Sequence, residues 1–432
     1  MITRIQAQKY RCFDQLDVHL GQYNMLAGAN GSGKTTLIDI PLLFRDMLSS
    51  SNLTQAFLEP SPVTHTLRTQ RLRDLTYCNI SDYFGFVLEA TLPDDVVGNL
   101  TSDGPGRMWV DHKRLPHTLR YEIRLQIFND IELEVTDEYL WLVPEGAAQR
   151  KGNVIIDRYA PNGWRPIIVR ETRGSSESID VRSGSVSVRP ERGGKGFYFR
   201  LNPNELALKN LPLDASLFPA SVWFITMLKT RTIWYEPDIS KLQQDSQLVS
   251  ANTIRPDAAN LPWQVLSLQR ERPDDLNDWI AHVQTALPYI KKIEAIERED
   301  DFHAYLNVMY DGNFTLPSSG LSAGTLRILA LTILPYLIEQ PAIICLEEPE
   351  NGLHPRAIQA VLDSLHSLYD SQVFLSTHSP IVLAHTDLSE VVIMQSEGGG
   401  EKKAIAGNRH PQLQDWRGGI DLGSLFAAGV LE

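Results

Sequence analysis

The sequence predicts an α/β fold that carries a β-rich insertion and a helical insertion. The first observation is a glycine-rich loop at residues 28–35, between a short apolar run and a helical pattern. The second is a pair of apolar runs, 343–346 and 373–376, each followed by ionisable side chains. The third is a change to short strand patterns separated by turn residues between about 84 and 200. Helical patterns that alternate with apolar strands are typical of an α/β protein.

The glycine-rich loop has the pattern Gly, four residues, Gly-Lys-Thr at residues 28–35. Residues 23–27 predict a buried strand before it, and residues 34–49 predict a helix after it. Glycines let backbone N–H groups turn toward phosphate oxygens, and the helix start adds its positive dipole end. In such a loop Lys34 reaches the β- and γ-phosphates, and the Thr35 hydroxyl binds Mg²⁺. The loop therefore predicts a P-loop NTPase, the alternative being a turn followed by Lys-Thr by chance.

The composition is that of an ordinary globular protein with room for two or three domains. Of 432 residues, 43% are hydrophobic and 22% are charged. The formal net charge of −13 argues against a whole surface that binds nucleic acid. Cys12, Cys78 and Cys345 lack the spacing of metal ligands. Because no signal-like run and no membrane span is predicted, we expect a cytoplasmic protein with no membrane partner.

The strand and helix patterns divide the chain into four predicted segments. These are 1–83 with the glycine-rich loop, a β-rich insertion at 84–202, a helical subdomain at 203–292, and a C-terminal part at 293–432. Further strands are predicted at 2–13, 15–20, 84–90, 119–125, 153–156, 196–200, 342–346, 373–376 and 391–395, with alternation at 293–310 and helices at 323–339 and 356–370.

The β-rich middle of the chain is locally basic. Residues 151–200 carry ten Lys and Arg against five Asp and Glu, a net charge of +5. A basic sheet can contact nucleic acid or an acidic partner. The alternative is a solvated sheet face whose edge is protected by charges.

Three further motifs lie in the C-terminal part. The buried strand 343–346 is followed by Glu347 and Glu348, whose charge a Mg²⁺ ion and a water would offset. The segment 321–325, Leu-Ser-Ala-Gly-Thr, begins a predicted helix 26 positions before Glu347. Another apolar strand ends at His378, 31 positions after Glu347.

Together these motifs resemble the ABC-type ATPase heads of the SMC, RecF and OLD-nuclease lineage, over roughly residues 1–40 and 293–432. The motif at residues 347–355, Glu-Glu-Pro-Glu-Asn-Gly-Leu-His-Pro, is similar to that of stand-alone bacterial AAA-family ATPases from anti-phage or genome-maintenance loci. By this resemblance 28–35 is the Walker A loop and 343–348 is Walker B. It likewise makes 321–325 the signature and 350–355 the D-loop.

The resemblance implies a role for each matching residue. Glu347 would hold Mg²⁺ with Thr35, Glu348 would polarise the attacking water, and His378 would touch the γ-phosphate. Lys34, Glu348 and His378 are thus the implied catalytic residues. The implied ATP-binding residues are Arg11, Gly28, Asn30, Gly31, Ser32, Gly33, Lys34, Thr35, Thr36, Ser322, Ala323 and Gly324.

The sequence departs from the family pattern at three places. Glu347 stands where the family has an aspartate, which changes how Mg²⁺ is reached. Ala323 and Thr325 replace a glycine and a glutamine of the signature. The Q-loop residue stays open between Gln55 and Gln70.

The implied function is an ATPase that forms a homodimer or higher oligomer around ATP and Mg²⁺. Ser322 and Gly324 would complete the partner's site. Long coiled-coil arms are absent, and only 54 residues follow His378, too few for the Toprim domain of OLD nucleases. We therefore expect an ATPase that regulates or scaffolds a separately encoded nuclease or other effector. The alternatives are an ATP-dependent dimerisation module that does not hydrolyse ATP, and a transporter ATPase subunit.

Overall fold

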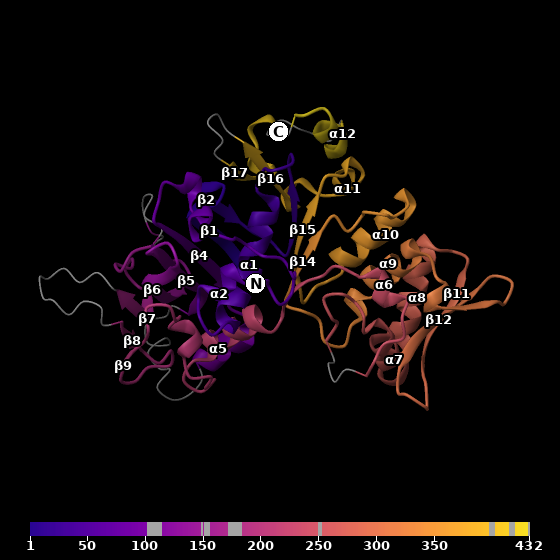
Figure 1. Cartoon of the computed structure of the whole chain (residues 1–432), viewed down its shortest axis with the longest axis horizontal. Coiled ribbons are helices and arrows are strands. Elements are labelled where there is room, and N and C mark those ends of the chain that lie inside the picture. Colours follow the sequence, from indigo (N-terminus) through magenta and orange to yellow (C-terminus); the bar gives the residue numbers. More distant parts are fainter. Residues whose placement is uncertain are drawn as a thin grey trace, which may run out of the picture. The chain divides into compact units, whose positions relative to one another are not determined.

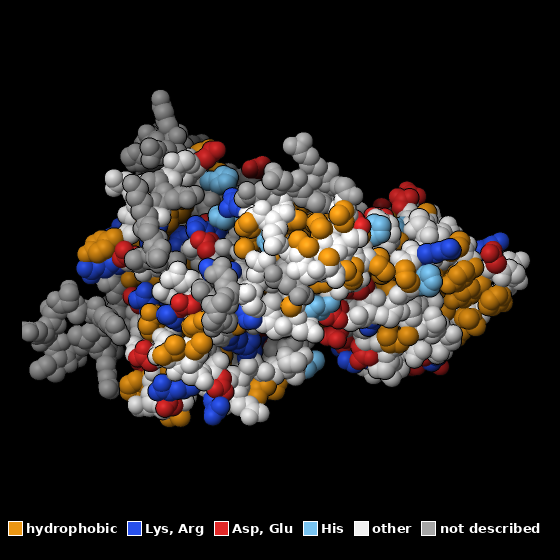
Figure 2. Space-filling view, turned by 90° about the horizontal axis from the view of Figure 1, so that it is seen from above, with side chains coloured by type: hydrophobic (Ala, Val, Ile, Leu, Met, Phe, Trp, Pro, Cys, Tyr) orange, Lys and Arg blue, Asp and Glu red, His pale blue; other side chains and the backbone are white. Residues whose placement is uncertain are grey.

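A computed structural model of the protein describes residues 1–101, 115–147, 150, 156–171, 184–248, 253–396, 402–413 and 420–430. Within these ranges, no helix combines the length and the apolar character that crossing a membrane requires. On the face shown in Figure 2, Lys and Arg side chains are interspersed with Asp and Glu side chains.

The described residues form two compact units. Unit 1 comprises residues 1–21, 30–232 and 394–406, and unit 2 comprises residues 22–29, 233–393 and 407–432. The four predicted segments stay a prediction, since compactness groups the chain differently. Strands of the N-terminal segment and of the predicted β-rich insertion share one sheet in unit 1.

Unit 1 is built on an antiparallel sheet in the order β2-β1-β4-β5-β6-β7-β8-β9 (Figure 1). The strands are β1 Ile2–Tyr10, β2 Phe13–His19, β4 Tyr83–Thr91, β5 Pro116–Phe128, β6 Glu132–Pro144, β7 Arg165–Glu171, β8 Ser185–Val188 and β9 Phe197–Arg200. Unit 1 also holds α1 Lys34–Ser49, α2 Gln55–Leu58, α3 Asp94–Thr101, α5 Pro219–Lys229 and β17 Lys402–Ala406.

The buried face of this sheet packs against helix α1 through aromatic side chains. Phe44 of α1 makes edge contacts with Phe86 and Tyr121, at ring-centroid distances of 5.7 and 5.9 Å. All three rings are fully buried. Such contacts contribute beyond the area that they bury, so α1, which begins at the glycine-rich loop, is fixed on the sheet.

Unit 2 contains parallel strands β14 Ile343–Glu347, β15 Gln372–Thr377, β3 Tyr23–Ala27 and β16 Val391–Ser396, which pair in that order. All five residues of β3 are buried, as are the six of β15. These runs lack polar alternation because both faces of a parallel sheet are covered. Figure 1 shows β14 and β15 side by side.

The helices of unit 2 are α6 Ile239–Leu242, α7 Leu261–Glu271, α8 Pro273–Ala286, α9 Ala323–Thr332, α10 Pro355–His366, α11 Pro380–Ala384 and α12 Leu422–Ala427. A small antiparallel sheet contains β11 Ile290–Glu297, β12 Ala304–Tyr310 and β13 Thr315–Pro317. The remaining strand is β10 Thr232–Trp234.

Two expectations about secondary structure need correction. The helix predicted at 323–339 ends at Thr332 and continues as a short 3₁₀ turn at Leu334–Tyr336, because Pro335 has no N–H to extend the α-helix. The segment 203–292, predicted to be helical, also contains the short strand β10. Residues 153–155 of the strand predicted at 153–156 lie outside the described residues.

Candidate functional site

The glycine-rich loop follows strand β3 directly and ends where helix α1 begins. Gly31 and Gly33 have φ angles of 73° and 100°, in the region that favours glycine. A Cβ at Gly33 would lie 3.0 Å from both Cys12 Sγ and the Phe13 ring. The N-cap residue of α1 is Gly33, which has no side chain to cap the helix, so the helix N-terminus suits an anionic group.

Several side chains of the loop suit a phosphate ligand. The Ser32 hydroxyl is buried and has no hydrogen-bond partner among the described residues. Lys34 is 6% exposed, whereas Asn30 and Thr35 are exposed. Thr36 shares a hydrogen bond with the Cys12 thiol. A buried hydroxyl without a partner costs free energy, which a phosphate oxygen could offset.

Within unit 2, the carboxyl ends of three parallel strands lie at one edge of the sheet. Glu347 pairs with Ser376 across β14 and β15. Thr377 pairs with Ala27 across β15 and β3. Glu347, Glu348, His378 and the start of the glycine-rich loop at Gly28 therefore share this edge. Ligand sites of open α/β sheets lie outside such carboxyl ends.

Glu348 adopts an unusual backbone conformation at this edge. Its φ of 45° lies in the left-handed region, and its N–H donates to the Ser376 carbonyl at 2.9 Å. The Asn351 side-chain amide donates to Glu348 Oε2 at 2.6 Å, and His378 Nε2 lies 3.7 Å from Oε1. Left-handed residues that are not glycine cost free energy and are concentrated at functional sites. Glu348 is thus held in place by its backbone and by two side chains.

Glu350 connects the D-loop segment to the end of β15. Its Oε1 accepts a hydrogen bond from the Thr377 hydroxyl at 2.5 Å, and the same hydroxyl accepts one from the Ser379 N–H. Burial raises the pKa of Glu350 above its ordinary value. Its Oε2 is buried without a hydrogen-bond partner among the described residues. The hydrogen bonds of the Thr377 hydroxyl to Glu350 and Ser379 fix the backbone directly before His378.

The segment predicted as the signature forms the start of helix α9. Ser322 is the N-cap, and its Oγ accepts a hydrogen bond from the Thr325 N–H at 3.1 Å. Ser322 and Ala323 are exposed. A Cβ on Gly324 would lie 3.6 Å from the Gly352 carbonyl oxygen. The helix start is therefore preformed, with an exposed face beside the D-loop segment.

Arg327 of α9 donates a hydrogen bond to the Asn351 backbone carbonyl. Since the Asn351 side chain bonds Glu348, these two contacts link the signature helix to the predicted catalytic carboxylate. Arg327 and Thr377 were not predicted as site residues, whereas Glu350 and Asn351 were predicted only as part of the D-loop. The position of Asn351 inside the predicted D-loop was the one signal available for it.

Other predicted residues are engaged in local contacts. The Arg11 guanidinium donates to the Arg68 carbonyl at 2.6 Å, which gives this side chain a structural partner. Gln55 Oε1 accepts hydrogen bonds from the Ser51 hydroxyl and the Asn52 N–H. Gln70 is exposed. The choice between Gln55 and Gln70 as the Q-loop residue stays open.

The basic region 151–200 is only partly a surface feature. Arg170 is completely buried, with its guanidinium 3.6 Å from the equally buried Glu138. Arg170 therefore cannot contact a nucleic acid, which corrects the count of basic residues at the surface. Lys151, Arg173 and Arg182 lie outside the described residues.

Among the described residues, no group of three or more His, Cys, Asp and Glu side chains could hold a metal ion. A Mg²⁺ ion bound mainly through phosphates and water needs only one or two protein oxygens. Thr35 and Glu347 stay the predicted Mg²⁺ ligands, since each side chain carries such an oxygen.

Comparison with known proteins supports the fold. Residues 200–384 match the family described as "AAA domain, putative AbiEii toxin, Type IV TA system". This range includes α9, β14, β15 and His378 but not the glycine-rich loop. No curated protein matches the chain.

Similar solved structures are SMC heads. The crystal structure of the SmcHead bound to the C-winged helix domain of ScpA is 12% identical, with a TM-score of 0.51, over 94% of this chain and 97% of that chain. An Smc head with an extended coiled coil, bound to the C-terminal domain of ScpA derived from Pyrococcus furiosus, is 11% identical with a TM-score of 0.48, over 94% and 95% of the chains. An SMC head domain from Thermotoga maritima is 11% identical with a TM-score of 0.42, over 94% and 98%.

The first of these structures shows that the chain has the P-loop ATPase fold of an SMC head. The predicted fold class and the resemblance to SMC/ABC-like ATPases are thereby confirmed.

Proposed function

We propose that this SMC-head-like chain binds ATP with Mg²⁺, hydrolyses it, and dimerises around the nucleotide. The observation that carries the proposal is the shared carboxyl edge in unit 2. Glu347, Glu348 and His378 lie at that edge together with Gly28. The order of strands thus brings the start of the phosphate loop to the edge that holds two carboxylates and a histidine.

Each residue has a role that its environment supports. Backbone N–H groups of the loop, the Lys34 ammonium and the Ser32 hydroxyl bind phosphate oxygens. Bound Mg²⁺, held by Thr35 and Glu347, would neutralise charge on the phosphates. Glu348 orients the attacking water, and Asn351 positions the carboxylate through its 2.6 Å hydrogen bond.

The proposed dimer uses the exposed start of helix α9. Ser322, Ala323 and the backbone at Gly324 would contact the γ-phosphate bound by a second copy. A γ-phosphate that both copies bind gives ATP a differential affinity for the dimer, and hydrolysis removes it. Dimerisation should therefore follow the nucleotide state.

A trapped dimer tests the proposal. E348Q keeps the shape and the Asn351 contact of the side chain but lacks the carboxylate charge. It should bind ATP and accumulate as a dimer in light scattering, while the wild-type protein returns to monomer as ATP is consumed. K34A is the control that should stay monomeric. An E348Q protein that binds ATP and stays monomeric would contradict the dimer.

We further propose that the ATPase regulates a separately encoded nuclease or other effector, in anti-phage defence or DNA maintenance. The SMC head of similar fold is bound to a winged-helix domain of ScpA, which supports a protein partner here. Native copurification with the products of neighbouring genes tests this. Recovery of the chain alone, with those genes expressed, would count against it. We also propose that the basic region 151–200 contacts nucleic acid.

A further inference from the structure

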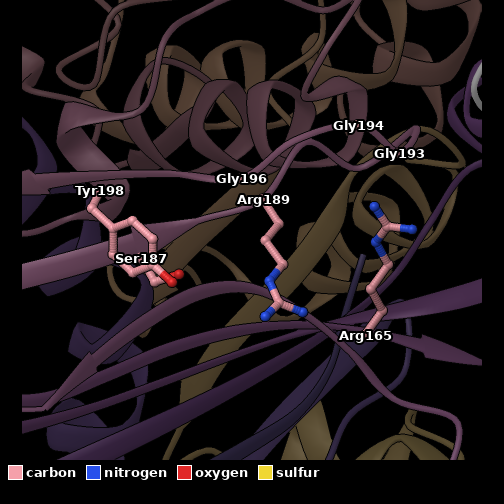
Figure 3. Close-up of a pocket in the computed structure, with 7 residues that line it drawn as sticks. All are labelled: Arg165, Ser187, Arg189, Gly193, Gly194, Gly196 and Tyr198. Carbon is pink, nitrogen blue, oxygen red and sulfur yellow. The ribbon is translucent and has the colours of Figure 1, made fainter.

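A hollow of about 420 Å³ lies in unit 1 on the sheet formed by β7, β8 and β9. Its lining includes the side chains of Arg165, Ser187, Arg189 and Tyr198 together with glycines of the loop between β8 and β9. Figure 3 shows the Arg189 side chain between Tyr198 and Arg165, with the glycine loop running past them. The lining thus combines two guanidinium groups with two hydroxyl groups.

Strand register brings these residues together. Ser187 pairs with Tyr198 across β8 and β9, so their side chains share one face of the sheet. The Arg189 N–H donates to the Ile167 carbonyl at 2.9 Å, which continues the pairing of β8 with β7 beyond Val188. Gly196 is required in the loop, because a Cβ there would lie 3.0 Å from the Val188 carbonyl oxygen. The hairpin is therefore tight enough to hold the lining in place.

Both arginines bring positive charge to the hollow. No described group pairs with the charge of Arg189. The Arg165 guanidinium donates to the Pro190 carbonyl at 2.5 Å, and burial lowers its pKa although the Glu191 carboxylate acts in the opposite direction. In the described part of the chain, no group makes a hydrogen bond or ion pair with the Arg189 guanidinium, and Arg189 is exposed. The Glu191 carboxylate interacts electrostatically with Arg165 and accepts its hydrogen bonds from the first turn of helix α5.

Glu191 accepts hydrogen bonds from the Ala220 N–H, the Ser221 N–H and the Ser221 hydroxyl, at 2.7, 2.8 and 2.5 Å. Its carboxylate is completely buried. The hydroxyls of Ser187 and Tyr198 have no partner among the described residues. The hollow thus offers hydrogen-bond donors and positive charge to a ligand from outside the chain.

We propose that this hollow is a phosphate-binding site. Two guanidinium groups and adjacent hydroxyl donors are the groups that proteins use to bind phosphate oxygens. The exposed ring of Tyr198, 73% accessible, could stack on a base next to that phosphate. A charged sheet edge would explain one exposed arginine. It does not explain why the hydroxyls of Ser187 and Tyr198 line the same hollow as that arginine.

The phosphate can belong to a nucleic-acid strand or to a free nucleotide. The proposal deepens the proposed nucleic-acid contact and does not depend on ATP hydrolysis. Binding of a fluorescent single-stranded oligonucleotide, of AMP and of inorganic phosphate should be measured on the full-length protein, at low and at raised salt. Rates of ATP hydrolysis are measured in parallel, so that failure of either proposal can be distinguished.

The main variant is R189Q, since Arg189 is exposed and its loss should not disturb folding. R189Q should weaken binding about tenfold or more, because a charge-assisted hydrogen bond is lost. The matched control is R200Q, which removes the same charge from an exposed position on β9. R200Q should change affinity about twofold at most, and ATP hydrolysis should be unchanged in both variants.

The ligand that responds to R189Q identifies the source of the phosphate. Loss of oligonucleotide binding with weak binding of AMP and phosphate assigns the site to a nucleic-acid strand, and Y198A should then weaken binding further. Loss of AMP or phosphate binding assigns it to a small ligand. Binding of none of the three, or equal losses in R189Q and R200Q, would overturn the proposal.

Discussion

The Asn351 side-chain amide donates a hydrogen bond to Glu348 Oε2 at 2.6 Å, on a loop that Arg327 of helix α9 also contacts. The Asn351 backbone makes a second hydrogen bond to the same residue, since its N–H donates to the Glu348 carbonyl at 3.0 Å. The carboxylate proposed to orient water is therefore supported by a residue of the next loop. It is also linked to the helix whose exposed start is proposed to contact a partner.

The first prediction concerns this hydrogen bond. N351A should lower kcat for ATP hydrolysis by about tenfold or more while ATP affinity stays within about twofold, because a misplaced catalytic group mainly affects the chemical step. N307A is the control, since Asn307 makes a similar amide contact to Glu294 in unit 2, on strand β12. An N351A enzyme with wild-type kcat would show that the contact does not position Glu348.

Ser322 allows the helix cap to be separated from the dimer contact. S322G removes the hydroxyl, but glycine at an N-cap costs only about a few tenths of a kcal/mol. We therefore expect a stable protein that binds ATP as a monomer and fails to dimerise in light scattering. D421G, at the N-cap of α12, should dimerise normally. Wild-type dimerisation by S322G would remove Ser322 from the interface.

The buried pair of Arg170 and Glu138 should contribute strongly to the stability of unit 1. Arg170 donates to the carbonyls of Glu205 and Asn202 as well. R170M leaves a buried carboxylate and two carbonyls without this partner, which should lower the free energy of unfolding by about 3–5 kcal/mol. Urea unfolding measures the loss, with R200Q as the exposed control. A loss under about 1 kcal/mol would contradict the assigned burial.

Glu191 should make the stability of unit 1 depend on pH. Burial raises the pKa of Glu191 to about 7, from 4.5. Between these values the unfolded chain releases the proton while the folded protein keeps it, so this group stabilises the fold below pH 4.5. The contribution is lost as pH rises toward about 7.

E191Q provides the test of this pH dependence. Relative to E191Q, the wild-type protein should lose on the order of 3 kcal/mol of unfolding free energy between about pH 4.5 and 7. Chemical unfolding of both proteins across that range measures the difference. Parallel stability curves for the two proteins would show that Glu191 titrates as an ordinary carboxylate.

The sequence was sufficient for the parts of the fold that local patterns determine. The loop at 28–35, its flanking strand and helix α1 lie where the patterns predict them, because glycine positions and apolar runs are local features. Strand β10 was missed because three residues are too few to show a period. The strands that precede the glycine-rich loop, Glu347 and His378 pair with one another in unit 2, so these motifs share one edge of the sheet.

The parts that sequence could not provide depend on tertiary contacts. Charge counting placed Arg170 in a basic surface, whereas the fold buries it beside Glu138. Arg11 stays a predicted nucleotide-binding residue, and the fold adds a hydrogen bond from its guanidinium to the Arg68 carbonyl that the sequence did not predict. The Asn351 contact arises from a left-handed turn at Glu348, a conformation that glutamate rarely adopts.

The most direct measurement is steady-state hydrolysis of ATP by the purified wild-type chain and by E348Q, with ATP binding measured on the same samples. We predict Mg²⁺-dependent release of phosphate by the wild type and a rate lower by about a hundredfold or more in E348Q, with ATP affinity retained. Hydrolysis by E348Q at the wild-type rate would contradict the role of Glu348. Absence of ATP binding by the wild type would contradict the site as a whole.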